Sequence, residues 1–274
     1  MEYLDNLFNV KDKIAVITGG SGVLGSEIAK GLSEAGAIVI ILGTNEEKIK
    51  QKLDYIGSSH KHNAGYVCDV VNKNMVMEVY KRIIDKFRQI DILVNAAGGN
   101  VYSATLNTDQ TFFDMDIEGF RKAVDLNLFG TVLPTQIFAR SMTEQKQGSI
   151  INISSMASFK AITRVAGYSA AKAAIDNFTR WLSVEMALKF GSGIRVNAVA
   201  PGFLLTEQNK HLLTNSDGSL TDRGKSIINM TPFKRFGSPD ELIGTVIWLA
   251  SDASKFVTGT TIPVDGGFNI FSGV

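Results

Sequence analysis

Tyr168, Lys172 and Ser155 are the residues whose types and spacing first suggest chemistry. Tyr168 and Lys172 are four residues apart in a helical pattern, so their side chains share one face of the predicted helix. This spacing leaves the lysine ammonium near the phenol or near a ligand beside it. Ser155 lies thirteen residues before Tyr168, at the end of an isoleucine-rich run typical of a strand. We therefore expect a polar site where a strand and a helix meet.

A glycine-rich loop near the N-terminus is the second candidate site. Residues 18–25, TGGSGVLG, lie between an apolar run at 14–17 and a helical pattern. A strand followed by such a loop and a helix gathers backbone N–H groups that suit an anion such as a pyrophosphate. The glycines are spaced G-x-x-G-x-x-G rather than G-x-G-x-x-G, so an ordinary glycine-rich turn is the alternative.

Short runs of β-branched residues alternate with longer helical patterns, which is typical of a parallel sheet covered on both faces. The predicted strands are residues 14–17, 37–42, 65–67, 92–94, 149–153, 194–199 and 261–263. The predicted helices lie near residues 25–35, 46–56, 73–88, 117–144, 166–190 and 239–251. No linker divides the 274 residues. We therefore expect an α/β fold at 1–274, a single-domain doubly wound (Rossmann) parallel seven-stranded sheet with helices on both faces.

Two segments are longer than the connection of these elements requires. Residues 99–116 follow the fourth predicted strand, and residues 203–232 follow the sixth. Both leave the carboxyl ends of strands, the edge at which open α/β sheets bind ligands. Long loops in a domain of this kind are usually functional or disordered. We expect both segments to contact a substrate.

The composition excludes several classes of partner. Lys and Arg number 28 and Asp and Glu 27, which leaves no basic field for nucleic acid or an anionic membrane. No apolar run approaches the roughly eighteen residues of a membrane span, and the N-terminus lacks the apolar core of a secretory signal. Cys68 is the only cysteine, and His60 and His62 have no third ligand at a suitable spacing. We expect a soluble cytoplasmic protein that binds a small molecule and no metal.

A series of motifs resembles the short-chain dehydrogenase/reductase family over essentially the whole chain. The motifs are Thr18-Gly19 with Gly25, Asp69-Val70, Asn95-Ala96-Ala97-Gly98, Asn127, Ser155, Tyr168 with Lys172, Pro201-Gly202 and Thr206. The resemblance implies an NAD(P)-dependent enzyme that transfers a hydride between a nicotinamide and a keto or hydroxy group. The cofactor contacts that it implies are Gly19, Ser21, Gly22, Val23, Leu24, Gly25, Thr44, Asn45, Asp69, Val70, Asn95, Ala96, Ala97, Gly98, Tyr168, Lys172, Pro201, Gly202 and Thr206.

The same resemblance implies a role for each catalytic candidate. Tyr168 would donate a proton to the carbonyl oxygen, where negative charge develops as the hydride arrives. Lys172 would favour the phenolate of Tyr168 and hold the nicotinamide ribose. Ser155 would hydrogen-bond the substrate oxygen, and Asn127 would link Lys172 through water to the solvent.

The glycine loop departs from the family pattern T-G-x-x-x-G-x-G. Val23 stands where the family has a glycine, so we expect the loop to be shifted by one residue, with Gly22 closest to the pyrophosphate. Family members that use NADP often have a basic residue at the position of Gly22, and those that use NAD often have an acid at the position of Gly43. This chain has neither, which leaves NAD and NADP open. We favour NAD, because a 2′-phosphate would lack an obvious cation.

Several stretches resemble one group of this family, the D-mannonate oxidoreductases (fructuronate reductases). They include NAAGGN, FFDMD, APGFLLTEQN and PVDGGFNIFSGV. The resemblance implies reduction of D-fructuronate to D-mannonate, and a polyhydroxy acid needs hydrogen-bond partners and a cation. We expect Asn100, Ser155, Tyr168 and Lys210 to contact this substrate. The other polar candidates of the second long segment are Asn209, His211, Asn215, Arg223 and Lys225.

Other functions remain open. A gluconate 5-dehydrogenase or a 3-oxoacyl-thioester reductase would use the same chemistry, although a long acyl chain predicts a more apolar lid than residues 206–223. A non-catalytic nucleotide-binding protein could keep the fold but would be expected to lose Tyr168 or Lys172. Family members usually form dimers or tetramers, and the apolar residues 268–274 agree with this, so we expect a homotetramer.

Overall fold

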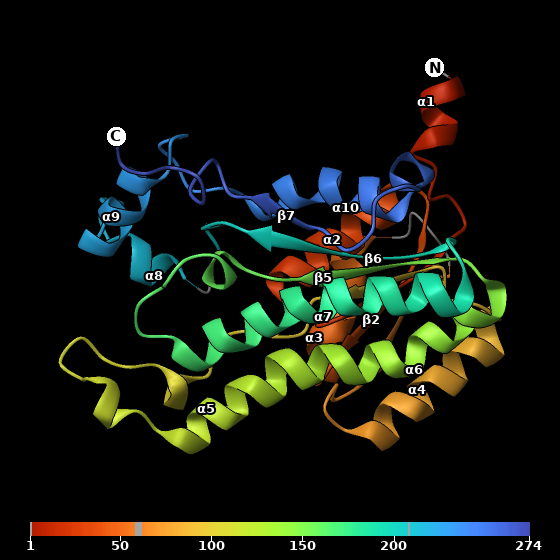
Figure 1. The fold of residues 1–274 in the computed structure, drawn as a ribbon, viewed down its shortest axis with the longest axis horizontal. Helices are drawn as coiled ribbons and strands as arrows, with labels where there is room; N and C mark the ends of the chain where they lie inside the picture. The colour runs from red at the N-terminus through yellow and green to blue at the C-terminus, as the bar shows by residue number, and fades with distance from the viewer. Residues whose placement is uncertain (1, 58–61, 208) are drawn as a thin grey trace.

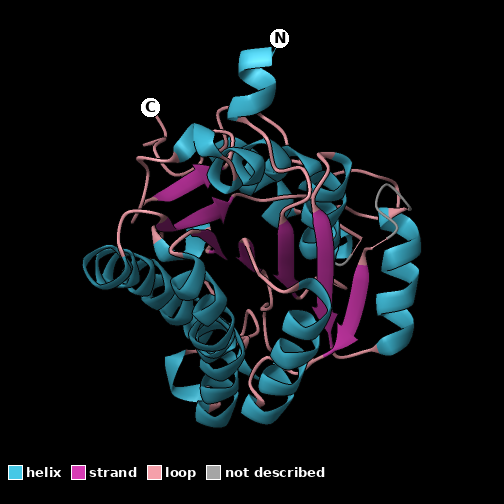
Figure 2. Ribbon diagram, turned by 90° about the vertical axis from the view of Figure 1, so that its right-hand side faces the viewer, coloured by secondary structure: helices cyan, strands magenta, loops and turns pink. Residues whose placement is uncertain are grey.

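A computed structural model describes residues 2–57, 62–207 and 209–274, in which seven parallel strands form one sheet (Figure 2). The strands are β1 Ile14–Thr18, β2 Ile38–Gly43, β3 Ala64–Val67, β4 Ile92–Asn95, β5 Gly148–Ile153, β6 Ile194–Pro201 and β7 Thr261–Val264. The seven predicted strands are confirmed. Their spatial order is β3-β2-β1-β4-β5-β6-β7. Strands β1 to β3 are added toward one edge of the sheet and strands β4 to β7 toward the other, so the order of addition reverses between β1 and β4. Doubly wound sheets bind ligands in the crevice at such a reversal.

Helices cover both faces of the sheet, as predicted (Figure 1). One face is covered by α2 Val23–Glu34, α3 Glu46–Ile56 and α10 Ile243–Ala250. The other is covered by α4 Lys73–Phe87, α6 Gly130–Gln145 and α7 Ala166–Phe190. The residues of β1 alternate between the two cores, since Ala15 and Ile17 face the first layer whereas Ile14 and Val16 face the second. Burial on both faces explains why the first four residues of this strand, 14–17, are all apolar.

The helix expected at residues 117–144 is interrupted. It consists of α5 Ile117–Val124, a π-helical turn at Asp125–Phe129, and α6. Within the turn, the Asn127 Nδ2 donates to the Ala123 carbonyl oxygen at 2.8 Å. Such a turn inserts one extra residue into a helix and is frequent at functional sites.

Three of the α-helices in the described residues were not predicted from the sequence. They are α1 Glu2–Leu7, α8 Lys210–Leu213 and α9 Asp222–Met230. The first has no buried residue and projects from the body of the molecule near the N-terminus (Figure 1). The other two lie within the second long segment, residues 203–232. We call this segment the roof, because it lies over the carboxyl ends of the strands.

A ladder of polar side chains crosses the core below the carboxyl edge of the sheet. The Asn95 Nδ2 of β4 donates to the Thr135 hydroxyl at 2.8 Å and to the Asn152 Oδ1 at 2.9 Å. The Asn152 Nδ2 of β5 donates to the Thr179 hydroxyl of α7 at 2.9 Å. All four side chains are buried. The ladder therefore fixes α6 and α7 against the central strands, at the level from which the site projects.

Candidate active site

A cleft of about 820 Å³ follows the carboxyl edge of the sheet. Nineteen of the residues expected at the site line it: Gly19, Ser21, Gly22, Val23, Leu24, Gly25, Thr44, Asp69, Val70, Ala96, Ala97, Gly98, Asn100, Ser155, Tyr168, Lys172, Pro201, Gly202 and Thr206. The cleft thus brings together the glycine loop, three of the four predicted catalytic side chains and the start of the roof. Chain segments from the ends of six strands, β1 to β6, contribute to it.

Four expected residues do not line the cleft. The Asn45 Oδ1 caps α3 by accepting from the Lys48 N–H at 2.8 Å. Asn95 is buried in the polar ladder, since its side chain points into the core rather than toward a cofactor. Asn127 is fully buried behind the wall of the cleft, and Lys210 is exposed on the roof. A motif match therefore placed these residues near the site but did not determine where their side chains point.

The predicted catalytic group lies where β5 ends and α7 begins. The Ser155 Oγ accepts from the Ala157 N–H at 3.1 Å, and its side chain hydrogen-bonds the phenol of Tyr168. Lys172 is one turn further along α7, with its Nζ 5.5 Å from the centroid of the Tyr168 ring. Burial raises the pKa of Tyr168, although the bond to Ser155 opposes that rise. In the protein alone, burial therefore favours the protonated phenol.

Lys172 is a buried cation with two fixed neighbours. Its Nζ donates to the Ile153 carbonyl oxygen at 2.7 Å. Burial lowers the pKa of Lys172 to about 8, and the carboxylate of Asp176, one turn further along α7, acts in the opposite direction. The Asp176 Oδ1 has no hydrogen-bond partner in the part of the chain that the structure describes. Asp176 thus stabilises the charged form of Lys172 through the field of its carboxylate.

Asn127 holds the turn that follows β4. Its Nδ2 donates to the Gly99 carbonyl oxygen at 2.9 Å, and its Oδ1 accepts from the Gly99 N–H at 3.0 Å. Gly98 has φ 152°, and a Cβ there would lie 2.6 Å from the Asn127 Oδ1 and 3.6 Å from the Lys172 Nζ. Asn127 therefore lies close to Lys172.

The glycine loop fits the pyrophosphate of a dinucleotide. Gly22 is the N-cap residue of α2, and no side chain caps this helix terminus. The loop packs closely against the turn after β4, because a Cβ on Gly19, which has φ 63°, would lie 2.7 Å from the Ala97 backbone. Gly25 lets the helix approach the strand end, since a Cβ there would lie 2.3 Å from the Gly19 carbonyl oxygen. An uncapped helix N-terminus that opens into a cleft attracts an anion.

The roof encloses the other side of the cleft with both apolar and polar groups. Its lining residues are Phe203, Leu204, Thr206, Asn209, Leu212, Leu213 and Arg223. α8 and α9 are connected through an antiparallel bridge between Thr214 and Leu220. From the sequence, Arg223 is one polar candidate among several, whereas the structure brings it to the cleft. Leu212 and Leu213 were missed, because an apolar pair within a polar segment gave no indication that it faces inward.

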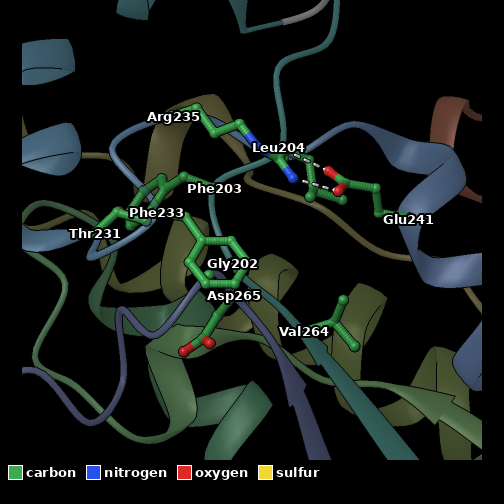
Figure 3. A pocket seen from close by; sticks show the side chains of 11 residues that line it. Gly202, Phe203, Leu204, Thr231, Phe233, Arg235, Glu241, Val264 and Asp265 are labelled. Atoms are coloured by element: carbon green, nitrogen blue, oxygen red, sulfur yellow. Dashed lines mark hydrogen bonds and ion pairs between the residues drawn. The ribbon is translucent and has the colours of Figure 1, made fainter.

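A second cavity of about 170 Å³ lies where the roof meets the end of β7 (Figure 3). It shares Gly202, Phe203 and Leu204 with the cleft. Across it, both terminal nitrogens of Arg235 donate to the carboxylate of Glu241, at 2.7 and 2.6 Å. This two-pronged ion pair fixes the chain where it returns from the roof to the body of the protein.

No helix in the described ranges is long and apolar enough to cross a membrane. The residues that the structure describes also contain no group of three or more His, Cys, Asp or Glu side chains that could hold a metal ion. Of the two histidines considered in the sequence, His60 lies outside the described residues.

The fold and the cleft define the class of Rossmann-type oxidoreductases that use a nicotinamide dinucleotide. Residues 21–269 match a family model described as Enoyl-(Acyl carrier protein) reductase. The chain belongs to the short-chain dehydrogenase/reductase family.

Three relatives illustrate the range of this similarity. The chain is 43% identical to "Uncharacterized oxidoreductase UxuB" of Bacillus subtilis (strain 168), over 97% of this chain and 98% of the relative. A candidate D-mannonate oxidoreductase from Haemophilus influenza, solved with bound NAD, is 42% identical with a TM-score of 0.90, over 97% and 98% of the two chains. A gluconate 5-dehydrogenase from Burkholderia cenocepacia J2315, solved with NADP and tartrate, is 32% identical with a TM-score of 0.84, again over 97% and 98%.

Proposed function

We propose that this oxidoreductase interconverts the keto and hydroxy forms of a sugar acid, with D-fructuronate and D-mannonate as the pair. The observation that carries the proposal is the polar part of the lining of the cleft that also holds Ser155 and Tyr168, namely Asn100, Thr206, Asn209 and Arg223. Hydroxyl groups of a sugar can bond the amide and hydroxyl side chains, and Arg223 offers a cation to the carboxylate. The similarity to the candidate D-mannonate oxidoreductase supports the same substrate class.

Four side chains would carry the chemistry of this site. When bound, the nicotinamide supplies or accepts the hydride. Tyr168 donates its phenolic proton to the substrate oxygen during reduction and takes it back during oxidation. Ser155, already hydrogen-bonded to the phenol, holds the substrate oxygen beside it. Lys172 stabilises the phenolate that remains and holds the nicotinamide ribose, while Asn127 links Lys172 through water to the solvent.

We propose NAD as the preferred cofactor. The 2′-phosphate of NADP would lie near Gly43 and Thr44, at the end of β2. Among the described residues, the only lysine and arginine that line the cleft are Lys172 and Arg223, which belong to the catalytic end and the roof. The first turn of α3 after β2 carries two acids, Glu46–Glu47, that would repel a phosphate. A Michaelis constant for NADPH far below that for NADH would overturn this preference.

A 3-oxoacyl-thioester reductase is the second candidate. The apolar part of the roof lining, Phe203, Leu212 and Leu213, favours it, as does the description of the matching family model. A gluconate 5-dehydrogenase would use the same polar lining as the first candidate. A non-catalytic role is disfavoured, because Tyr168 and Lys172 are both present at the cleft.

A substrate panel separates these functions. Reduction of D-fructuronate, 5-keto-D-gluconate and an acetoacetyl thioester would be followed separately with NADH and NADPH, with Tyr168→Phe to report the background. We expect the highest kcat/KM with D-fructuronate and NADH. Turnover of the thioester without turnover of either sugar acid would overturn the proposed substrate class while leaving the oxidoreductase family unchanged.

We also propose that residues 1–274 act as one domain within a homotetramer. Trp181, Val184 and Leu188 lie along one side of α7 and are 60%, 58% and 78% exposed. Large apolar side chains at this helical spacing form a stripe that tends to be covered by a partner. Light scattering at micromolar concentration should give the mass of a tetramer, and a monomeric mass would contradict the proposal.

A further inference from the structure

Two limbs of the chain join the roof to the body of the protein, and they are bonded to each other at its base. The outgoing limb is residues 202–206, which follow β6, and the return limb is residues 235–241. The Gly237 N–H donates to the Phe203 carbonyl oxygen at 3.0 Å, and the Gly237 carbonyl oxygen accepts from the Leu205 N–H at 2.9 Å. These two bonds make a parallel bridge. The position of the outgoing limb therefore depends on the position of Gly237.

Of these two limbs, the outgoing one reaches the cleft. Residues 202–204 and 206 line the cleft, whereas no residue from 235 to 241 does. Both limbs line the second cavity, where the outgoing limb contributes Phe203 and Leu204 (Figure 3). The return limb is therefore in contact with the outgoing limb but not with the cleft, and it can act on a bound substrate through the outgoing limb.

The ion pair between Arg235 and Glu241 closes the return limb around Gly237. Besides the two bonds from Arg235, at 2.7 and 2.6 Å, the Glu241 Oε2 accepts from the Ser238 N–H at 2.8 Å. A Cβ on Gly237 would lie 2.6 Å from the Leu204 side chain and 3.3 Å from the Glu241 Oε2, so only a glycine lets both approach this closely. The bonds from Arg235, and then that from Ser238, lower the pKa of Glu241 to about 2. The pair therefore stays charged at neutral pH.

Global stability is a poor explanation for this ion pair. The side chains of Arg235 and Glu241 are 52% and 38% exposed, and ion pairs of such exposure contribute little to the free energy of unfolding. A two-pronged pair does, however, fix the geometry of the chain that carries it. Arg121 and Glu118 form an ion pair of the same 2.6 Å distance, but within one turn of α5. What distinguishes the pair of Arg235 and Glu241 is the backbone that it holds.

We propose that Arg235 and Glu241 are positioning residues for the substrate. Their ion pair holds Gly237 in place, and Gly237 holds residues 203–206 where they line the cleft. Displacement of the outgoing limb leaves Tyr168 in place, because that side chain belongs to α7. The pair should therefore affect the binding of the substrate and not the proton transfer. The inference goes beyond the proposed function, since any of the candidate substrates would contact this limb.

The test breaks the ion pair from each side and separates KM from kcat. Arg235→Gln and Glu241→Gln should each raise KM for D-fructuronate by roughly 3- to 10-fold and change kcat by less than about twofold. The variant with both changes should lose no more than either single variant, because the two residues act through one pair. Arg235→Lys keeps the charge but loses the two-pronged geometry, so its KM should fall between those of the wild type and Arg235→Gln.

A matched control and a second measurement separate positioning from damage to the fold. Arg121→Gln breaks the exposed pair on α5 and should leave KM and kcat unchanged. The amide groups of Leu205 and Gly237 are the two donors of the bridge, so their hydrogen exchange should become several-fold faster in Arg235→Gln and stay unchanged in Arg121→Gln. The urea midpoint should stay at that of the wild type in all variants, because the pair is exposed.

The outcomes distinguish the inference from the proposed function. A raised KM with an unchanged kcat and faster exchange at the bridge supports positioning. An unchanged KM in Arg235→Gln and Glu241→Gln overturns it, and so does a lowered urea midpoint with a matching loss of kcat, which would assign the pair to the fold. If the wild type reduces the acyl thioester and no sugar acid, the proposed substrate fails, and KM for the thioester then tests the same two variants.

Discussion

The floor of the cleft, where Ser155, Tyr168 and Lys172 lie, is built on buried strands, whereas its roof consists of short helices joined largely by exposed polar side chains. Below the floor, the ladder from Asn95 to Thr179 contains only buried groups. In the roof, α8 has four residues and α9 has nine, and the turn between them is held by bonds among exposed residues.

The buried floor and the more exposed roof suit different steps of catalysis. Proton transfer requires side chains held within a few tenths of an ångström, which a packed core provides. Substrate entry and release require a segment that can open without unfolding the rest of the protein. We therefore expect mutations in the floor to change chemistry or global stability, and mutations in the roof to change substrate recognition or local stability.

The largest effect is expected at Tyr168. Tyr168→Phe keeps the ring and removes the proton donor, so the turnover number should fall by roughly 10²–10⁴-fold, the usual contribution of a general acid. The affinity for NADH, measured by fluorescence titration, should stay close to that of the wild type. Full turnover by this variant would remove Tyr168 from the proposed chemistry.

The next largest effect tests the ladder beneath the floor. Thr179→Val keeps the shape of the side chain but leaves the buried Asn152 Nδ2 without its acceptor, 2.9 Å away. The free energy of unfolding should fall by about 1–3 kcal/mol, as measured by urea denaturation with an unchanged slope. Thr143→Val is the control, because the hydroxyl of Thr143 bonds only its own helix, at the Arg140 carbonyl oxygen, and its change should stay within about 0.5 kcal/mol. Equal losses in the two variants would contradict a special role for the ladder.

The same contrast explains what the sequence could and could not predict. Central strands such as β1 were found because burial on both faces makes them apolar runs, and α7 was found because its helical pattern is long. The catalytic side chains follow from motifs tied to these elements. The π-helical turn was not predicted, since it depends on side-chain bonds from Asn127 to Ala123 and to Gly99, which is 28 residues away in sequence.

The roof was predicted as a functional segment but not as a structure. Its helix α9 depends on a capping bond from Thr221 and on close packing of Gly224 against the Leu213 carbonyl oxygen, where a Cβ would lie 2.2 Å away. The packing against Leu213 is tertiary, and nine residues carry too little helical periodicity to reveal the helix from the sequence. For the same reason the sequence favoured Lys210 for the substrate, whereas the fold brings Arg223 to the lining of the cleft.

A smaller effect is expected from Asp176, which belongs to the floor but touches no substrate. Asp176→Asn removes the carboxylate that raises the pKa of Lys172, so that pKa should fall below its present value of about 8. The rate of reduction uses the protonated lysine and should therefore begin to decline at a lower pH than in the wild type. The profile of kcat/KM between about pH 6 and 10 measures the shift. Glu185→Gln, a change of the same kind further along α7, should leave the profile unchanged, and an unshifted profile in Asp176→Asn would remove Asp176 from the control of Lys172.

The smallest effect is expected in the roof and tests whether it opens separately from the floor. The Thr221 Oγ1 accepts from the Gly224 N–H at 3.1 Å and donates to the Leu212 carbonyl oxygen at 2.8 Å, so it caps α9 and joins it to α8. Thr221→Ala should cost the roof about 1 kcal/mol, which corresponds to a roughly fivefold faster amide exchange in residues 222–230. The urea midpoint should not move, because the strands and the ladder determine global unfolding. If Thr221→Ala instead lowered that midpoint as much as Thr179→Val does, the roof and the floor would unfold as one cooperative unit, and substrate entry would need a path other than local opening of the roof.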